Sequence, residues 1–173
     1  MVLFGWDKHE DRRGFFVRTF DTAVAASLDL PEFVQDSQSR SHRGVVRGLH
    51  GRSGDGEAKL VRVARGAIFD VVVDARPGSD TFGRHEAFAL DDQAMRSLYI
   101  PPGCLHGFQV MSEVADVCYR ISRVHDPAED VAVRFDDPTL KIAWPEPVTA
   151  SSERDATAQP WSDLVDRLGR PRP

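Results

Sequence analysis

Ala67-Ile68-Phe69-Asp70-Val71-Val72-Val73-Asp74 is the strongest β-strand signal in the chain. Its β-branched and aromatic residues favour extended backbone, and turn residues stand on both sides of it, at Gly66 and at Pro77-Gly78. Working outward, further apolar or alternating runs occupy residues 59–64, 83–90, 97–100, 105–111, 114–121 and 131–135. Many short strands separated by glycine and proline turns predict an all-β sandwich or barrel.

The composition predicts one globular domain, residues 1–173, with a frayed tail at residues 169–173. The chain has 173 residues, of which 41% are hydrophobic and 28% charged, and this length suffices for a buried core. Its net charge of −5 argues against a nucleic-acid or anionic-membrane partner. There are only two cysteines, Cys104 and Cys118, and neither a signal peptide nor a membrane-spanning run is recognisable. We therefore expect a cytoplasmic protein.

Short helices are expected at the periphery of this β structure. Residues 22–30 are the best helix candidate, because Pro31 ends an alanine-rich run. A second, amphipathic helix is expected near the C-terminus, where Trp161, Leu164 and Leu168 recur at helical spacing.

Arg47-Gly48-Leu49-His50 carries the first candidates for chemistry, and Lys59 follows it closely. In a regular strand, Arg47 and Leu49 would point to one face, and Gly48 and His50 to the other. A single histidine among polar neighbours is most often a surface or packing residue. This segment alone therefore predicts no function.

Six segments stand along the chain in one order and at one spacing. They begin at Arg47 (RGLH), Ala58 (AKLVRVARGAIFDVVVDARPGSDTFG), Tyr99 (YIPPGCLHGFQV), Val117 (VCYRIS), Arg134 (RFDDPTLKIAWP) and Ser151 (SSERDA). Together they resemble the dTDP-4-dehydrorhamnose 3,5-epimerase family, from about residue 11 to residue 163. The resemblance implies a cupin-type jelly roll with short peripheral helices, a homodimer, and an isomerase that needs no cofactor or metal. Its substrate would be a nucleotide-linked 4-keto-6-deoxy sugar, inverted at C3, C5 or both.

The resemblance also implies catalytic roles for individual residues. Such a reaction needs a base that removes a proton beside the ketone, a group that holds the enolate charge, and an acid on the opposite face. Carried over by position, His50 is the base and Asp155 its carboxylate partner. Lys59, with His106, stands beside the enolate, and Tyr119 is the acid.

Substrate-binding roles are carried over in the same way. Arg13, Arg47 and Arg154 match positions that hold the diphosphate or nearby groups. Phe16 matches the position that stacks on the base, in a segment, residues 11–20, that the family lends to the neighbouring subunit's site. The remaining matched binding positions are Arg18, Gln35, His106, His125 and Asp130.

Several of these residues also fit a purely structural role. Asp155 fits the first turn of a helix, and Tyr119 alternates with Val117 as sheet filling would. His106 follows a Pro-Pro-Gly turn and fits a histidine bonded to backbone. Phe16 is, by its residue type, more often a core residue.

Four positions depart from the family pattern, and all concern the ligand pocket. Arg18 stands where relatives have a glutamate that bonds thymine, Gly51-Arg52 replaces Tyr-Gln, Ser37 replaces an asparagine, and His125 replaces a tyrosine. Arg18 and Arg52 add donors, which favours a base with more acceptors than thymine or extra contacts to phosphate, unless both side chains point into solvent. His125 changes the neighbour of Tyr119, which predicts epimerisation at one carbon, C3.

Two other classes of function compete with the epimerase. The first is a metal-dependent cupin enzyme that uses His50, Glu57 and His106, although Arg52 stands where a second histidine would complete a His-x-His pair. The second is a non-catalytic protein that binds sugar nucleotides. Within the family, a sugar 3,4-ketoisomerase would need paired histidines near Arg47, which are absent.

Overall fold

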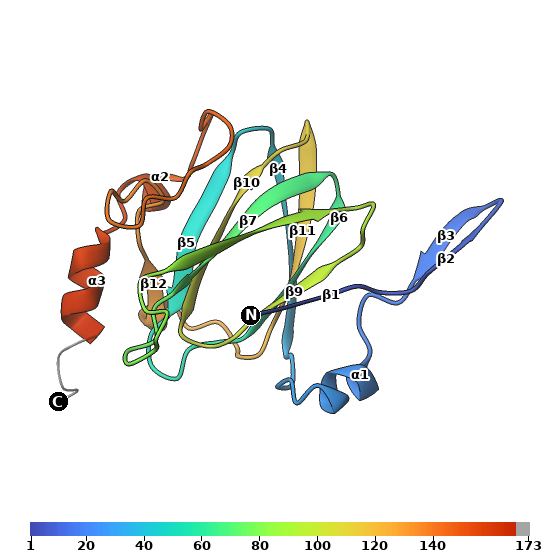
Figure 1. Ribbon diagram of the computed structural model, residues 1–173, viewed down its shortest axis with the longest axis horizontal. Helices are drawn as coiled ribbons and strands as arrows, with labels where there is room; N and C mark the ends of the chain where they lie inside the picture. Colours follow the sequence, from blue (N-terminus) through green and yellow to red (C-terminus); the bar gives the residue numbers. More distant parts are fainter. Residues whose placement is uncertain (169–173) are drawn as a thin grey trace.

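Two five-stranded antiparallel sheets face each other in the computed structural model, which describes residues 1–168 (Figure 1). The first sheet has the order β1 (Val2–Phe4), β9 (Ser97–Ile100), β6 (Lys59–Arg65), β11 (Val114–Ile121), β4 (Gln35–His42). The second has the order β12 (Asp130–Ala132), β5 (Val46–Arg52), β10 (Cys104–Val110), β7 (Ala67–Asp74), β8 (His85–Asp91). This arrangement confirms the predicted all-β, cupin-type jelly roll. The predicted frayed tail, residues 169–173, lies outside the described residues.

The space between the two sheets is filled by one face of each strand. Ile68 and Val72 of β7 point into it, and they meet Val61 of β6 and Val117 of β11. Val71 and Val73 point to the opposite face of the same sheet and are equally buried. Because both faces of β7 are covered, its sequence is an almost unbroken apolar run, and this run gives the strongest β-strand signal in the chain.

The outer face of the second sheet is covered by the C-terminal part of the chain. Leu49, Val73 and Leu105 pack there against Trp161 and Leu164. The last two belong to α3 (Trp161–Leu168), whose amphipathic pattern predicted this helix correctly. The outer face of the first sheet carries polar residues such as Arg62 on β6 and Arg120 on β11, which point away from the buried Val61 and Val117.

The remaining helices are short and lie at the periphery, as expected. α1 (Thr22–Ser27) begins after the N-cap Asp21 and ends three residues before the predicted residue 30. α2 (Glu153–Ala156) begins after the N-cap Ser152, and a 3-10 turn occupies Pro127–Glu129. Within residues 1–168, no helix is long and apolar enough to cross a membrane.

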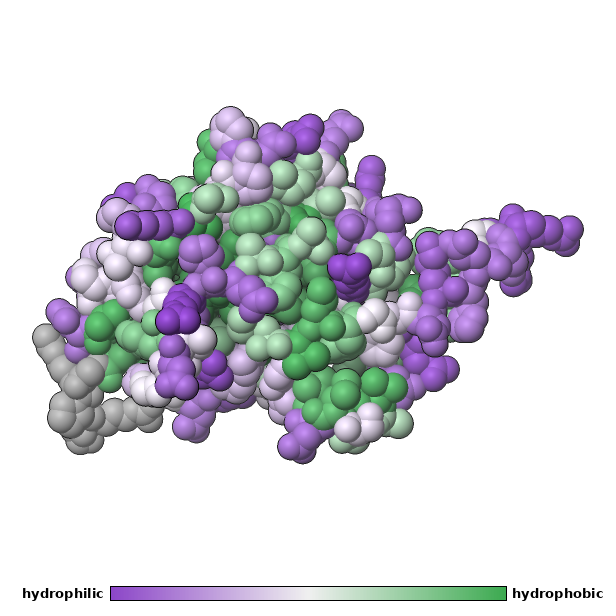
Figure 2. Space-filling view, in the orientation of Figure 1, coloured by the Kyte–Doolittle hydropathy of each residue, from purple (hydrophilic) through white to green (hydrophobic). Residues whose placement is uncertain are grey.

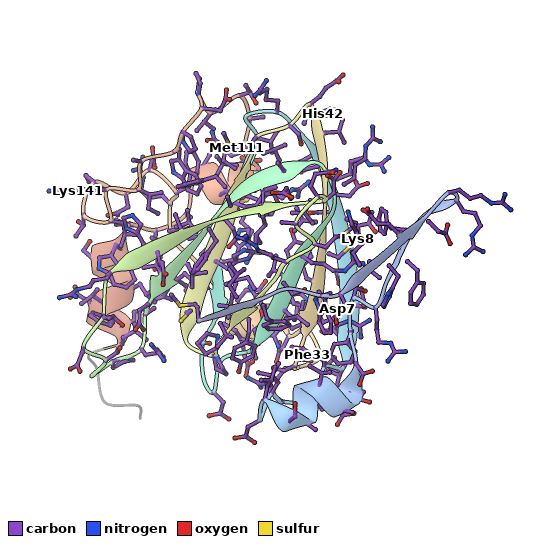
Figure 3. The ribbon with its side chains drawn as sticks, turned by 45° about the vertical axis from the view of Figure 1, so that its right-hand side comes forward. Asp7, Lys8, Phe33, His42, Met111 and Lys141 are labelled. Carbon is purple, nitrogen blue, oxygen red and sulfur yellow. The ribbon has the colours of Figure 1, made fainter. Side chains whose placement is uncertain are left out.

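A hairpin of β2 (Lys8–Asp11) and β3 (Gly14–Val17) extends away from the two sheets (Figure 1). In Figure 2 it forms a mainly hydrophilic arm at the right of the molecule. Figure 3 shows Asp7 and Lys8 where the chain leaves the body, and His42 and Met111 at the end of the sheets opposite α1. Phe15 and Phe16 on β3 are 53% and 65% exposed, so both rings are left largely uncovered by residues 1–168.

Candidate active site

A bulge in β5 brings Arg47 and His50 to the same face of the sheet. His50 lies opposite His106 and Arg47 opposite Phe108, so the two residues Gly48 and Leu49 oppose the single residue Gly107. The expected alternation, with Arg47 beside Leu49, is therefore wrong, because the extra residue reverses the facing. Phe108 belongs to the cluster between the sheets, which places Arg47 and His50 on the inner face.

Gly48 is required for this bulge. Its φ is +132°, and a Cβ at this position would lie 2.5 Å from the Cα of Gly107. Any other residue would meet strained backbone and a backbone clash at once. The glycine between Arg47 and His50 therefore decides which side chains reach the interior.

His50 and Asp155 form a hydrogen-bonded dyad, as predicted. Nε2 of His50 lies 2.6 Å from Oδ1 of Asp155, and the backbone N–H of Gly48 donates to Oδ2 at 3.2 Å. Burial disfavours the charged carboxylate, but these hydrogen bonds outweigh burial and lower the pKa of Asp155. Asp155 also lies in the first turn of α2, so both interpretations of this residue hold. The dyad leaves Nδ1 of His50 available to a ligand.

Lys59 lies next to the dyad at the start of β6. Its Nζ is 3.5 Å from the backbone carbonyl oxygen of His50 and 3.3 Å from Oε1 of Glu57. Burial lowers the pKa of Lys59, while the negative charge of Glu57 opposes that effect. A desolvated ammonium group of this kind interacts strongly with any negative charge that develops nearby.

His106 belongs to a second, fully buried dyad. Its Nε2 lies 2.7 Å from Oδ2 of Asp70, which is inaccessible to solvent. The expectation of a structural histidine bonded to backbone is thus corrected: the partner is a carboxylate. The sequence held a signal for Asp70, since a carboxylate in the middle of the most apolar strand requires a buried partner.

Tyr119 faces the interior from the first sheet. Its hydroxyl lies 2.8 Å from Oγ of Ser39, and its ring centroid is 6.3 Å from that of His106. Burial raises the pKa of Tyr119, an effect that the hydrogen bond with Ser39 only partly opposes. The phenol therefore stays protonated at neutral pH and can donate its proton. Ser39 had not been predicted.

Three predicted binding residues form a polar chain along β12 and α2. Asp130 lies 3.2 Å from Nε2 of His125 and accepts a hydrogen bond from Arg154 at 3.0 Å. Burial disfavours the charge of Asp130, but both partners together lower its pKa. Arg47 donates to Oγ of Ser41 at 2.8 Å, on the other side of His50.

Gln35, at the start of β4, carries a buried side-chain oxygen without a hydrogen-bond partner among the described residues. A buried acceptor of this kind is free to take a donor from a ligand. Its position beside Ile121 places it near the end of β11 that follows Tyr119.

Three predicted residues do not reach this site within one chain. Arg13 and Phe16 lie on the projecting hairpin, where Arg13 pairs with Asp11 at 2.6 Å. Arg18 follows the hairpin and pairs with the N-cap Asp21 at 2.7 Å.

Arg52 neither offers free donors to a ligand nor points into solvent. Its side chain is only 2% exposed, and it donates to the carbonyl oxygen of Val124 at 2.7 Å. Its Nε also lies 3.2 Å from Glu57. The alternative in which Arg52 points into solvent is therefore wrong.

The metal-binding alternative is not assembled in the part of the chain that the structure describes. No group of three or more His, Cys, Asp or Glu side chains there is placed to hold a metal ion. His50, Glu57 and His106 each face a different partner: Asp155, the cations Lys59 and Arg52, and Asp70. The donors proposed for a metal are thus engaged in separate ion pairs.

Comparison with known proteins identifies the family. Residues 1–163 match the family model described as dTDP-4-dehydrorhamnose 3,5-epimerase. The chain is 39% identical to the dTDP-4-dehydrorhamnose 3,5-epimerase of Pseudomonas aeruginosa, covering 94% of this chain and 92% of that one. It is 42% identical to the dTDP-4-dehydrorhamnose 3-epimerase of Streptomyces niveus, covering 88% and 75%.

A solved structure supports the same assignment. The 3,5-epimerase of Legionella pneumophila, in complex with dTDP-4-keto-L-rhamnose, superimposes with a TM-score of 0.91 at 37% identity, covering 99% of this chain and 93% of that one. These findings favour an enzyme over the metal-dependent cupin and the non-catalytic binding protein. The chain is an isomerase, and it belongs to the dTDP-4-dehydrorhamnose 3,5-epimerase family.

Proposed function

We propose that this enzyme inverts C3 of a dTDP-linked 4-keto-6-deoxy sugar without a cofactor. One observation carries the proposal: His50 and Tyr119 belong to opposite sheets and both face the space between them. A sugar ring held between the sheets would meet the base on one face and the acid on the other. Inversion requires that arrangement, whereas simple binding does not.

The neighbouring groups supply the rest of the chemistry. His50 removes the proton beside the ketone, and the carboxylate of Asp155 stabilises the imidazolium that forms. The ammonium of Lys59 stabilises the negative charge on the enolate oxygen, and the His106–Asp70 dyad adds a donor from the sheet that carries His50. Tyr119 then protonates the carbon from the opposite face and regains its proton from solvent.

The choice of dTDP rests on the relatives and on the two arginines. The relatives named above act on dTDP-linked sugars, according to their names. Arg52 is buried against Val124 and Glu57, and Arg18 pairs with Asp21, so neither arginine is placed within one chain to select guanine over thymine. We therefore propose that Arg47 and Arg154 hold the diphosphate, and that Gln35 and Asp130 bind nearby groups.

The experiment that tests this function is incubation with dTDP-, GDP- and CDP-linked 4-keto-6-deoxy sugars in deuterated water. We expect deuterium at C3 of the dTDP-linked sugar, little at C5, and much slower exchange with the other two nucleotides. Nuclear magnetic resonance at both carbons measures the rates. Matched rates at C3 and C5 would refute the single-carbon proposal, and a preference for GDP would refute the choice of nucleotide.

His125 is the residue on which the single-carbon proposal depends. It lies 3.2 Å from Asp130, which also binds Arg154, and its side chain is 55% exposed. The hydroxyl of Tyr119 is bonded to Ser39 instead, and we propose that this contact fixes a pose suited to one carbon. A His125→Tyr variant should gain exchange at C5, and a variant without that gain would count against this role.

We infer that the active enzyme is a homodimer in which residues 11–20 complete the neighbouring subunit's site. Phe15 and Phe16 on the hairpin are exposed, as are Val24 of α1 and Leu28, which follows that helix. Figure 2 shows a hydrophobic area at the lower right of the body, where Figure 1 places α1. Exposed apolar residues on a projecting arm favour burial against a second copy. In that arrangement Phe16 stacks on the base, and Arg13 and Arg18 approach the nucleotide.

Phe16 and Phe15 allow a matched test of this arrangement. Phe15 lies under the ammonium group of Lys8, at 5.3 Å, whereas Phe16 points to the other side of the hairpin. Phe16→Ala should weaken dTDP binding about tenfold or more, since base stacking contributes about 1–3 kcal/mol. Phe15→Ala should leave binding nearly unchanged. Isothermal titration gives the affinities, and sedimentation should give the mass of two chains; a monomer that binds dTDP normally would contradict the inference.

We also infer that the chain forms one domain and works in the cytoplasm. Each sheet contains strands from both halves of the sequence, which supports one folding unit. Both cysteines, Cys104 and Cys118, are free and buried, which fits a reducing compartment.

A further inference from the structure

Glu57 lies between two buried cations beside the proposed catalytic residues. Its Oε1 is 3.3 Å from Nζ of Lys59, and its Oε2 is 3.2 Å from Nε of Arg52. The three side chains are 10%, 12% and 2% exposed. Because so little water reaches them, the charges act on one another with little screening.

Two loops, residues 53–56 and 123–129, are hydrogen-bonded to each other beside these three side chains. The N–H of Ser53 donates to the carbonyl oxygen of Glu129, and Arg123 donates to that of Gly56. The carboxylate of Glu129 accepts from Arg123 and lies 3.9 Å from Arg52. Arg52 is thus fixed from two sides, and it can fix Glu57 in turn.

We propose that Glu57, anchored by Arg52, is a positioning residue that keeps Lys59 charged and directed towards His50. The proposal rests on the proposed catalytic role of Lys59. Without an anion in contact, a buried ammonium group loses its proton readily. Glu57 supplies that anion from the preceding loop and leaves the inner face to His50 and the substrate.

The electrostatic balance explains why an arginine belongs at position 52. A carboxylate paired with Lys59 alone would cancel most of the field that the lysine exerts on an enolate. Sharing Glu57 with Arg52 leaves the trio with a net positive charge. Burial lowers the pKa of Lys59 most strongly, and Arg52 lowers it further; Glu57, and more weakly Asp130, raise it. The other charged groups facing this cluster are Glu129 and Arg123.

The contacts are ionic rather than directional. Nε of Arg52 and Oε2 of Glu57 lie within ion-pair distance but are not aligned for a hydrogen bond, and neither atom has a hydrogen-bond partner among the described residues. Charge at these two positions should therefore matter more than shape, and glutamine is the appropriate replacement at both.

The test is the pH dependence of C3 deuterium exchange in Glu57→Gln, Arg52→Gln and the double variant. In Glu57→Gln the ammonium of Lys59 loses its anion, so activity should be lost at lower pH, by at least about one pH unit. At pH 8 this variant should exchange about tenfold or more slowly. Arg52→Gln removes a positive charge beside Lys59, so the loss of activity at alkaline pH should move to higher pH. The double variant should return towards the wild-type profile.

A direct measurement separates this inference from the catalytic role. Lysines labelled with 13C at Cε report ionisation by nuclear magnetic resonance, and the signal of Lys59 is the one that Lys59→Arg removes. We expect its titration to move in the same directions as the activity profiles. Glu86→Gln, an exposed change of the same chemistry on β8, should alter neither.

The titration and the activity profiles together show whether Glu57 maintains the charge of Lys59 or has only a structural role. Unchanged titration of Lys59 in Glu57→Gln would overturn the inference. Equal losses at every pH in both single variants, with a still weaker double variant, would also overturn it, because they indicate a structural role alone. If the wild type exchanged no deuterium, the proposed function would fail, while the titration would still decide whether Glu57 maintains the charge of Lys59.

Discussion

His50→Ala should lower C3 proton exchange by at least about a hundredfold, which is the usual contribution of a general base. On the inner face of β5, this histidine is paired with Asp155, a carboxylate that is only 2% exposed. Removing it takes away the imidazole that accepts the proton, and the remaining carboxylate of Asp155 is a weaker base than imidazole. Exchange in deuterated water, followed by nuclear magnetic resonance, measures the loss.

The folded state should survive this change. The side chain of His50 is 36% exposed, and Asp155 keeps its bond from the N–H of Gly48. His85→Ala, on the exposed edge strand β8, is the matched control and should exchange at the wild-type rate. Near-normal exchange in His50→Ala, with an unchanged melting temperature, would show that another group is the base.

Tyr119→Phe should separate proton exchange from inversion. The phenylalanine keeps the ring in the core but has no proton to give, so inversion should fall about a hundredfold or more. His50 can still remove the proton, exchange it with solvent at its exposed edge, and return it to the same face. Deuterium should therefore enter C3 while the configuration is retained.

Ser39→Ala provides the control for Tyr119→Phe. It removes the hydrogen-bond partner at 2.8 Å but leaves the phenol, so both rates should fall only modestly. The measurement is the ratio of deuterium uptake to inverted product for each variant. A Tyr119→Phe enzyme that loses exchange and inversion in equal proportion would exclude Tyr119 as the separate acid.

The sequence was sufficient for the fold because its strand pattern is regular. The apolar run of β7 and the amphipathic pattern of α3 depend on burial alone, and both were predicted correctly. The end of α1 was predicted less well, since Leu28 still fits the helical pattern although the helix stops at Ser27. Local propensity cannot fix such a boundary.

The site was predictable where residues match a known pattern, and not where geometry decides. The pairing of His50 with Asp155 followed from the resemblance and is present in the structure. The facing of Arg47 was mispredicted, because a bulge depends on pairing with β10 and leaves no periodic signal. The partners of Arg52 were also unforeseen, since they come from distant loops.

The bulge at Gly48 has a consequence for which substrates fit. It places Arg47 and His50 on one face of a single strand, three positions apart, with no hinge between them. Under the proposed roles, β5 fixes the distance between Arg47, which holds the diphosphate, and His50, which is the base. A sugar attached through one phosphate would fall short of His50, and a sugar attached through three would carry its reactive carbon beyond it. The enzyme should therefore discriminate between substrates by the number of phosphates that join the nucleoside to the sugar, whatever the sugar is.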